Sequence, residues 1–575
     1  MATPTSETSP LPIRDDDPAS GMSTPVVVPT LNDDNQNGAE TAPQASQSTP
    51  RDLRFWMVIV SIMVAEFLSA IELSSVATAL PTIVEDLHGT EFSWVGAAYA
   101  LGSTAILPMT GGLAQIFGRR PVLLGSMGFF ALGSGICGGA ANMNMLIAGR
   151  TIQGIGGGGI MSIANIVLAD LVPLSERGTF ICIFGAVWAI ACAIGPPIGG
   201  AFSQSNWRWL FYMNLPLTGF AALLAVFSLK LIKGPTEDTL RNKIRRMDLT
   251  GNAIIIVSTT ITMVALTWAG VQYSWDSAAV LVPLILGLFG LGAFFVYEAK
   301  VAVEPVVPLE LMGNRTSFLG YASVFLHGIV STAVIYYLPI YFQATLEQSP
   351  VKAGVSVFGN ALTMTPGAVA AGASTAIFAV YRPQNAIGWA LSAIGVGLLS
   401  LLDMSSSKAE WVGYQVIEGI GLGMLFTAPE FPILAPLPVT ETAHALAFFA
   451  FVRCFAQTWG VTIGATMLQN ELKKKLPRAF LEGLSSSAEK GVEIAYAAIP
   501  AIRSLEEPMK TEVKQAFAGS LRVIWLVMAG ISAAGILLVL GMKELKMHEV
   551  TDKDWGMKEE KKPGEDLESP TEKQL

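Results

Sequence analysis

Ionisable side chains stand inside long apolar segments of this 575-residue chain. Glu66 and Glu72 share one segment, and Arg150 lies in another, three residues before Gln153. Ionisable groups in membrane-length segments are costly, pair with one another and commonly mark proton or ion pathways. A helix would point Glu66 and Glu72 roughly 120° apart, so only one of them can face a narrow site. We predict that Glu72 and Glu66 handle protons; the alternative for either is a hydrogen bond to a neighbouring helix.

The composition excludes several classes of protein. Hydrophobic residues make up 51% of the chain and charged residues only 14%, whereas soluble domains carry about 25% charge. A soluble multidomain enzyme and a disordered chain are therefore both excluded. The four cysteines all lie in apolar runs, which argues against a disulfide scaffold. The net charge of -9, without a basic stripe, predicts no nucleic-acid partner.

Apolar stretches of about 20 residues recur from residue 55 onward, each long enough to cross a bilayer as a helix. We count fourteen of them: 55–80, 92–113, 121–141, 144–170, 179–202, 208–231, 248–269, 277–297, 317–343, 353–380, 385–403, 409–434, 442–469 and 519–542. The sequence therefore predicts an all-α membrane protein.

The loops between these stretches predict their orientation. With the N-terminus inside, basic residues gather in the inner loops, as the positive-inside rule requires. The long outer loop 470–518 departs from the rule, because it holds Lys473, Lys474 and Lys475. Residues 1–50 are polar and rich in Pro, Ser and Thr, which is typical of a disordered tail. They contain no apolar run typical of a cleaved signal peptide.

An internal repeat relates residues 150–200 to residues 415–465 at an offset of 265, without gaps. Identical residues at matching positions include glycines 154, 156, 158, 195 and 199, which meet glycines 419, 421, 423, 460 and 464. The two copies lie eight predicted spans apart, so they share one orientation. A parallel repeat is typical of transporters built from two halves around a site near the bilayer midplane.

Several motifs follow one another in a familiar order: IELSSVATALP (71–81), GGLAQIFGRR (111–120), RTIQGIG (150–156), GPPIGG (195–200) and NWRWLFYMNLP (206–216). With these motifs the chain resembles the major facilitator superfamily, specifically its fourteen-span drug:proton antiporter branch, which is common among fungal efflux pumps. The resemblance covers roughly residues 55–545. One departure is Gln115-Ile116, where the family pattern has an Asp-Arg pair; another is Ala191, where the pattern has a glycine.

The resemblance implies the major facilitator fold, with two six-helix lobes plus two extra central helices, fourteen transmembrane helices in all. It divides the chain into five parts: a disordered cytoplasmic tail (1–53), an N-terminal lobe (54–232), a linker with two additional transmembrane helices (233–316), a C-terminal lobe (317–542) with the extracellular loop 470–518, and a charged cytoplasmic tail (543–575).

The resemblance gives Arg150 a role in proton coupling, for which a structural ion pair or a carbonyl clamp is the alternative. The resemblance and the repeat also nominate residues for two further roles. The conformational motifs are expected at Gly111, Gly118, Arg119, Arg120, Gly195, Pro196, Pro197, Gly199 and Gly200. Candidates for the wall of a substrate cavity are Gln153, Asn165, Trp188, Glu430, Arg453 and Gln457. For each, plain helix packing or a structural ion pair is the alternative.

These features lead to the expectation of a secondary active transporter that exports small organic compounds such as drugs, toxins or secondary metabolites by proton-coupled alternating access. Uptake of a nutrient, polyamine or siderophore, by symport or facilitation, is the alternative, and a non-transporting receptor is the alternative of another class. The chain lacks nucleotide-binding and hydrolase motifs, so we expect no enzyme activity, no cofactor and no metal. We expect a monomer whose partners are a small-molecule substrate, protons and the lipid of the plasma membrane or the vacuole.

Overall fold

The computed structural model describes residues 52–87, 92–229, 240–270, 272–482, 498–499 and 501–547. The chain divides into two units, Met1–Thr49 and Pro50–Leu575, and all described residues belong to the second. Most of both predicted tails, and the middle of the predicted loop 470–518, lie outside the described residues.

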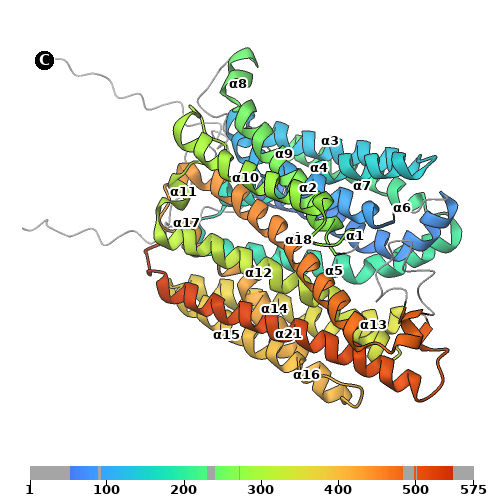
Figure 1. Ribbon diagram of the computed structural model, residues 1–575. Helices are drawn as coiled ribbons and strands as arrows, with labels where there is room; N and C mark the ends of the chain where they lie inside the picture. The colour runs from blue at the N-terminus through green and yellow to red at the C-terminus, as the bar shows by residue number, and fades with distance from the viewer. Residues whose placement is uncertain are drawn as a thin grey trace, which may run out of the picture. The chain divides into compact units, whose positions relative to one another are not determined.

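The described residues are helical and form no strand beyond a single bridge between Ala269 and Tyr273. Long helices lie side by side over most of the chain (Figure 1). The first half contains α1 (Leu53–Asp86), α2 (Phe92–Phe117), α3 (Arg119–Gly138), α4 (Met143–Leu171), α5 (Leu174–Ser205), α6 (Trp209–Tyr212) and α7 (Asn214–Ser228). The middle contains α8 (Leu240–Arg246), α9 (Leu249–Trp268), α10 (Ala278–Lys300) and α11 (Glu310–Gly313).

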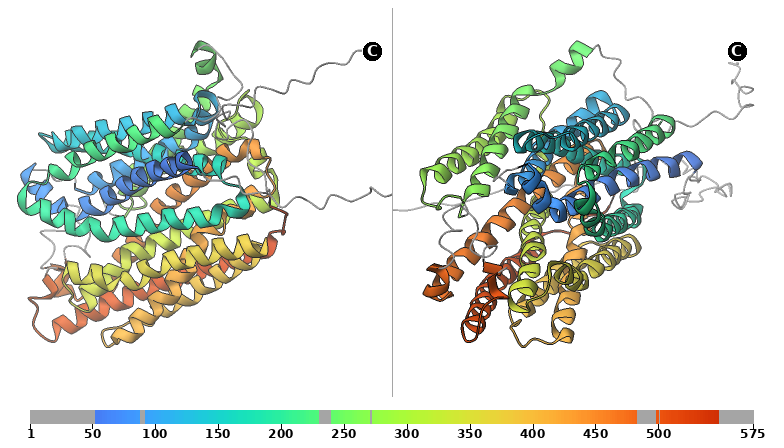
Figure 2. Two further views of the ribbon diagram at one scale, coloured as in Figure 1. Left: turned by 180° about the vertical axis from the view of Figure 1, so that it is seen from behind. Right: turned by 90° about the vertical axis from the view of Figure 1, so that its right-hand side faces the viewer.

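The second half begins at Arg315. Its elements are α12 (Arg315–Ile340), the π-helix η1 (Tyr341–Thr345), α13 (Pro350–Ser356), α14 (Phe358–Phe378), α15 (Arg382–Leu399), α16 (Lys408–Thr427), α17 (Glu430–Leu434), the 3₁₀ helix η2 (Val439–Glu441), α18 (Thr442–Lys475) and α21 (Met509–Gly541). In the views of Figure 2, the blue-to-teal helices of the first half lie beside the yellow-to-red helices of the second, and the orange α18 reaches in among the first half.

Twelve of the described helical segments are long and apolar enough to cross a membrane. The chain is therefore a multi-pass membrane protein. The sequence predicts fourteen spans. The two that are not among the twelve are α5 and α15, which are helical. Polar residues at the start of α15, Arg382 to Asn385, dilute its apolar character. Several side chains of α5 lie outside the described part of the chain.

Glycines on α4 and α16 bring matching helices together in the two halves. On α4, a Cβ at Gly156 would overlap the backbone of Phe130 on α3. On α16, a Cβ at Gly421 would overlap the backbone of Ser392 on α15 in the same way. Small residues allow this approach, which maximises van der Waals contact where no hydrophobic effect drives helices together. The sequence repeat is therefore also a repeat of helix packing.

The two halves meet along two helix pairs, α2 with α18 and α5 with α14. At Gly111 of α2, a Cβ would lie 2.9 Å from the carbonyl oxygen of Ala443 at the start of α18. Gln115 Nε2, one turn further along α2, donates a hydrogen bond to the carbonyl oxygen of Thr440 (2.9 Å). We call this end of the bundle, where α2 and α4 end and α3, α5 and α18 begin, the Arg119 end.

A buried ion pair joins the halves at the Arg119 end. Arg177 Nη1, in the first turn of α5, lies 3.4 Å from Glu430 Oε1, the first residue of α17, and both side chains are less than a tenth exposed. Ion pairs withdrawn from water resist separation, because each partner alone would be an uncompensated buried charge. The ion pair therefore stabilises the contact between the halves at this end.

Helix α9 lies in the seam between the halves. It packs on α2 and on α18 as well as on α10. Thr462 Oγ1 of α18 donates a hydrogen bond to the carbonyl oxygen of Leu266 (3.2 Å), and Trp94 of α2 packs edge-on against Trp268. Of the two helices beyond the repeated halves, α9 thus touches both of them.

The glycine contact between α4 and α3 predicts a difference in stability between two alanine variants. Gly156→Ala should lower the melting temperature of the purified protein, because overpacking costs about 1–3 kcal/mol. Gly128→Ala on α3 is the matched control, since a Cβ there meets nothing within 4 Å. Equal melting temperatures for the two variants would contradict the packing described here.

The ion pair between Arg177 and Glu430 can be measured by a double-mutant cycle. Arg177→Gln and Glu430→Gln should each lower the melting temperature, and the double variant should lose less than the sum, with a coupling of about 1–3 kcal/mol. The control pair is Arg246 with Glu304, 2.8 Å apart and more than a third exposed, whose coupling should stay below about 1 kcal/mol. Additive effects at Arg177 and Glu430 would show that the pair does not hold the halves together.

Candidate functional site

Arg150 and Gln153 are positioned by α4, which begins after Asn142. The Asn142 side chain accepts a hydrogen bond from the amide of Met145 (2.9 Å) and so satisfies one of the free donors at the helix start. The two side chains are three residues apart and therefore share one face of the helix. The glycines that follow Gln153 let α2 and α3 approach this face closely.

Arg150 forms an ion pair with Glu72 of α1 inside the first half. Arg150 Nη1 lies 2.7 Å from Glu72 Oε1, and their side chains are 1% and 0% exposed. The same Nη1 donates to Gln153 Oε1 (2.8 Å), and Nε donates to the carbonyl oxygen of Val95 on α2 (3.0 Å). The guanidinium carbon also lies 4.7 Å from the centre of the Tyr99 ring. The Arg150 guanidinium therefore has partners on three helices, α1, α2 and α4.

The second oxygen of Glu72 extends the network to two more helices. Asn214 Nδ2, at the start of α7, donates to Glu72 Oε2 (2.6 Å). Gln153 Nε2 donates to Ser134 Oγ of α3 (2.8 Å), and Asn214 Nδ2 lies 3.4 Å from the same hydroxyl. A single buried carboxylate is thus linked to α3, α4 and α7. Removing one member of such a pair costs about 3–5 kcal/mol, since the other charge remains buried without compensation.

Glu66 is separate from this network. It is 7% exposed and, among the described residues, has no partner within hydrogen-bond distance. Nearby on the same helix, the Ser69 hydroxyl is hydrogen-bonded to that of Tyr99 (2.8 Å). As their spacing predicts, Glu66 and Glu72 occupy different surroundings.

The other cavity candidates lie on α4, α5, α17 and α18. Arg453 of α18 lies between the rings of Phe426 (4.2 Å) and Phe449 (4.4 Å), donates to the carbonyl oxygen of Phe426 (2.6 Å) and is 9% exposed. Gln457, one turn further along α18, is exposed.

The remaining three cavity candidates are Glu430, Asn165 and Trp188. Glu430 pairs with Arg177 across the halves. Asn165 donates a hydrogen bond to the carbonyl oxygen of Met161 in its own helix (3.1 Å), and Trp188 packs half-buried beside Ala191. In this conformation, only Gln153 of the six candidates joins the charged network.

The loop between α2 and α3 turns at Gly118, whose φ of 90° favours glycine. The next residue, Arg119, is buried: its Nε lies 2.8 Å from Asp170 Oδ2 of α4, and its Nη1 donates to the carbonyl oxygen of Ala114 (2.9 Å). Arg120 is half-buried. Asp170 therefore supplies a carboxylate to this loop, in which the expected aspartate is replaced by Gln115.

The GPPIGG segment lies within α5 against α1. A Cβ at Gly195 would overlap the side chain of Ser74, and one at Gly199 would overlap the backbone of Ser75. Gly200 has open space around it, and Pro197 is exposed. The side chain of Pro196 lies outside the described part of the chain. Two of the glycines thus bring α5 onto the stretch of α1 next to Glu72.

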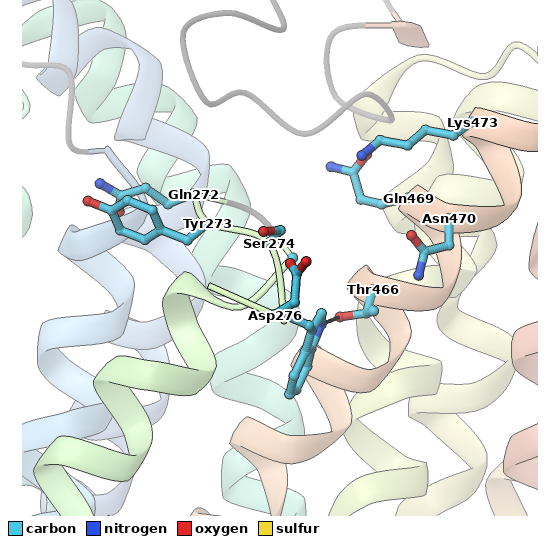
Figure 3. Close-up of a pocket in the computed structure, with 10 residues that line it drawn as sticks. Gln272, Tyr273, Ser274, Asp276, Thr466, Gln469, Asn470 and Lys473 are labelled. Carbon is cyan, nitrogen blue, oxygen red and sulfur yellow. Dashed lines mark hydrogen bonds between the residues drawn. The ribbon is translucent and has the colours of Figure 1, made fainter. Parts of the chain in front are cut away.

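At the opposite end of the bundle, a polar pocket of about 360 Å³ opens between the α9–α10 loop and α18 (Figure 3). Trp275 Nε1 donates to Thr466 Oγ1 (2.7 Å) and holds the loop against α18. The remaining lining side chains include Gln272, Asp276, Gln469, Asn470 and Lys473. The Lys473 side chain, unexpected in an outer loop, extends from the last turns of α18 at this pocket (Figure 3).

The sequence analysis names Glu72, Arg150 and Gln153 but misses their partners Asn214 and Ser134, and it also misses Asp170, the partner of Arg119. Asn214 stands in the NWRWLFYMNLP motif, so a signal was present. Ser134 and Asp170 have no such signal, because a serine or aspartate in the chain does not reveal which helix faces it. Among the described residues, no group of three His, Cys, Asp or Glu lies close enough to hold a metal ion.

Comparisons with known proteins agree with this architecture. Residues 62–461 match the family model of the Major Facilitator Superfamily. Efflux pump FUS6 of Gibberella moniliformis is 39% identical, with 91% of this chain and 94% of that protein aligned. MFS-type efflux pump LUC4 of a Fusarium species is 38% identical, with coverage of 91% and 93%.

Two solved structures share the fold at 13% sequence identity, each with a TM-score of 0.52. They are the human organic anion transporter MFSD10, with 84% of this chain and 99% of that one aligned, and the proton:xylose symporter XylE, with 84% and 94%. The family match, the relatives and the apolar helices lead to one conclusion: this chain is a multi-pass membrane transporter of the Major Facilitator Superfamily.

Proposed function

We propose that this transporter exports small organic compounds in exchange for protons. The observation that carries the proposal is the ion pair between Glu72 and Arg150, which is withdrawn from water within the first half. A proton on Glu72 would cancel its charge and leave Arg150 without a counter-ion. Proton binding would therefore change the contacts among α1, α3, α4 and α7 together, which makes this half sensitive to protons.

Alternating access requires the halves to separate at one end while they close at the other. The Arg119 end is closed by the pair Arg177–Glu430 and the hydrogen bond from Gln115 to Thr440. The polar pocket beside Trp275 lies at the opposite end. We infer that this conformation is closed toward the cytoplasm, because the sequence places the Arg119 end there by its excess of basic residues.

The relatives support the proposed direction and cargo. Two of them are named efflux pumps, and another is named for the acurin A biosynthesis cluster, at 36–39% identity over about nine-tenths of this chain. Export of a secondary metabolite or a toxic compound across the plasma membrane is the corresponding function here. We assign fourteen spans to the fold, with α5 and α15 completing two six-helix lobes (54–232 and 317–542) around the inserted α9 and α10.

The direction can be tested in a yeast strain that lacks its own major drug exporters, challenged with a panel of toxic fungal metabolites. An exporter should lower the intracellular level of at least one compound and raise the resistance of the cells to it, and a protonophore should abolish both effects. Greater accumulation and sensitivity would instead identify an importer. Export that persists unchanged without a proton gradient would refute the coupling.

The role of Glu72 can be tested by Glu72→Gln, which removes the charge and keeps the shape. This variant should fold and reach the membrane but lose export driven by a proton gradient, because it can no longer release Arg150 by binding a proton. The control is Glu410→Gln at the exposed start of α16, where Glu410 caps the helix through Ser407. Unchanged gradient-driven export by Glu72→Gln would show that the pair is only structural.

A further inference from the structure

The second half carries a buried carboxyl group, Glu418 of α16, at the place that corresponds to Gln153 in the first half. The sequence repeat relates the two residues, and the packing does so independently. A Cβ at Gly133 of α3 would overlap Gln153, and a Cβ at Gly395 of α15 would overlap Glu418. Glu418 therefore occupies, in the second half, the position that belongs to the charged network in the first.

The surroundings of the two positions differ in charge. Where α4 has Arg150, the repeat places Gln415 on α16. The Gln415 side chain is neutral: its Oε1 accepts from the amide of Asn360 (3.3 Å), and its Nε2 donates to the carbonyl oxygen of Trp411 (3.0 Å). The cation that compensates Glu72 has no counterpart here.

Glu418 itself is 0% exposed. Its Oε2 accepts a hydrogen bond from Asn360 Nδ2 of α14, and its Oε1 is buried and has no hydrogen-bond partner among the described residues. One neutral amide donor is thus the sole polar contact that the described residues give this carboxyl group.

The helices packed against α16 bring no charge to Glu418. α14 contains no charged residue, and in α15 the only one is Arg382, at its first position. His327 of α12 reaches α16 one turn away, at the carbonyl oxygen of Leu422 (3.1 Å).

Within α16 itself, the other charged residues are Lys408 and Glu410, both in the exposed first turn. An ionised Glu418 would therefore be a charge without a counter-ion in the protein interior.

We propose that Glu418 is a proton-binding site, held as a neutral carboxylic acid in this conformation, so that the second half of the transporter, like the first, carries a proton-sensitive carboxyl group. Burying an unpaired carboxylate costs far more than burying a neutral acid with one unmet hydrogen bond. The chemical step is the binding of one proton to a carboxylate oxygen of Glu418. Its use in transport rests on the proposed proton coupling, but its protonation does not.

Infrared difference spectra distinguish the two forms directly, because a protonated carboxyl and an ionised carboxylate absorb in separate regions. The protein in lipid vesicles at neutral pH should lose a protonated-carboxyl C=O band on Glu418→Gln. The matched control on the same helix, Glu410→Gln, should lose carboxylate bands instead, since Glu410 is exposed. Loss of carboxylate bands in Glu418→Gln would overturn the proposal.

A second variant keeps Glu418 in place. Asn360→Ala removes the only hydrogen-bond donor that the described residues give to its carboxyl group, so the protonated-carboxyl band should move to higher frequency without losing intensity. A shift confined to the carboxylate bands would again show an ionised Glu418. Both measurements need no substrate and no proton gradient, so they stand even if export proves to be independent of protons.

Discussion

The ion pair between Arg150 and Glu72 is the interaction on which the first half of this transporter depends. Both groups are almost completely withdrawn from water, so each is tolerable only while the other is present. The pair gathers helices α1, α2, α3, α4 and α7 around one charge, through Val95, Ser134, Gln153 and Asn214. A carboxylate thus lies where several helices converge, and the proposed proton coupling rests on this arrangement.

The second half repeats this construction with different chemistry. Glycines 419 and 421 of α16 hold α14 and α15 as glycines 154 and 156 of α4 hold α2 and α3. The backbone arrangement is therefore conserved between the copies, while Gln415 and Glu418 replace Arg150 and Gln153. The first half has the ion pair of Arg150 with Glu72, whereas the second half has the carboxyl group of Glu418 with the amide of Asn360. The repeat therefore places different charges at equivalent positions of the two halves.

Polar and small residues join the halves at the Arg119 end. Gly111 lets α18 approach closely, Gln115 donates a hydrogen bond to Thr440, and Arg177 pairs with Glu430. Beside them lies an apolar cluster to which both halves contribute, for example through Ala114 and Leu446. Helix α9, which touches α2 and α18, lies where any relative movement of the halves must be accommodated.

The sequence by itself determined the membrane class, because runs of about 20 apolar residues leave few other structures open. It also determined the parallel repeat and the ionisable residues that merit attention. Only the tertiary structure decided that Arg150 pairs with Glu72 rather than Glu66, that Asp170 pairs with Arg119, and that no described residue supplies a cation to Glu418. The reason is geometric. Spacing along one helix shows which of its side chains share a face. The partners on other helices depend on the distance and the rotation between helices, and glycine contacts between distant segments determine this distance and rotation.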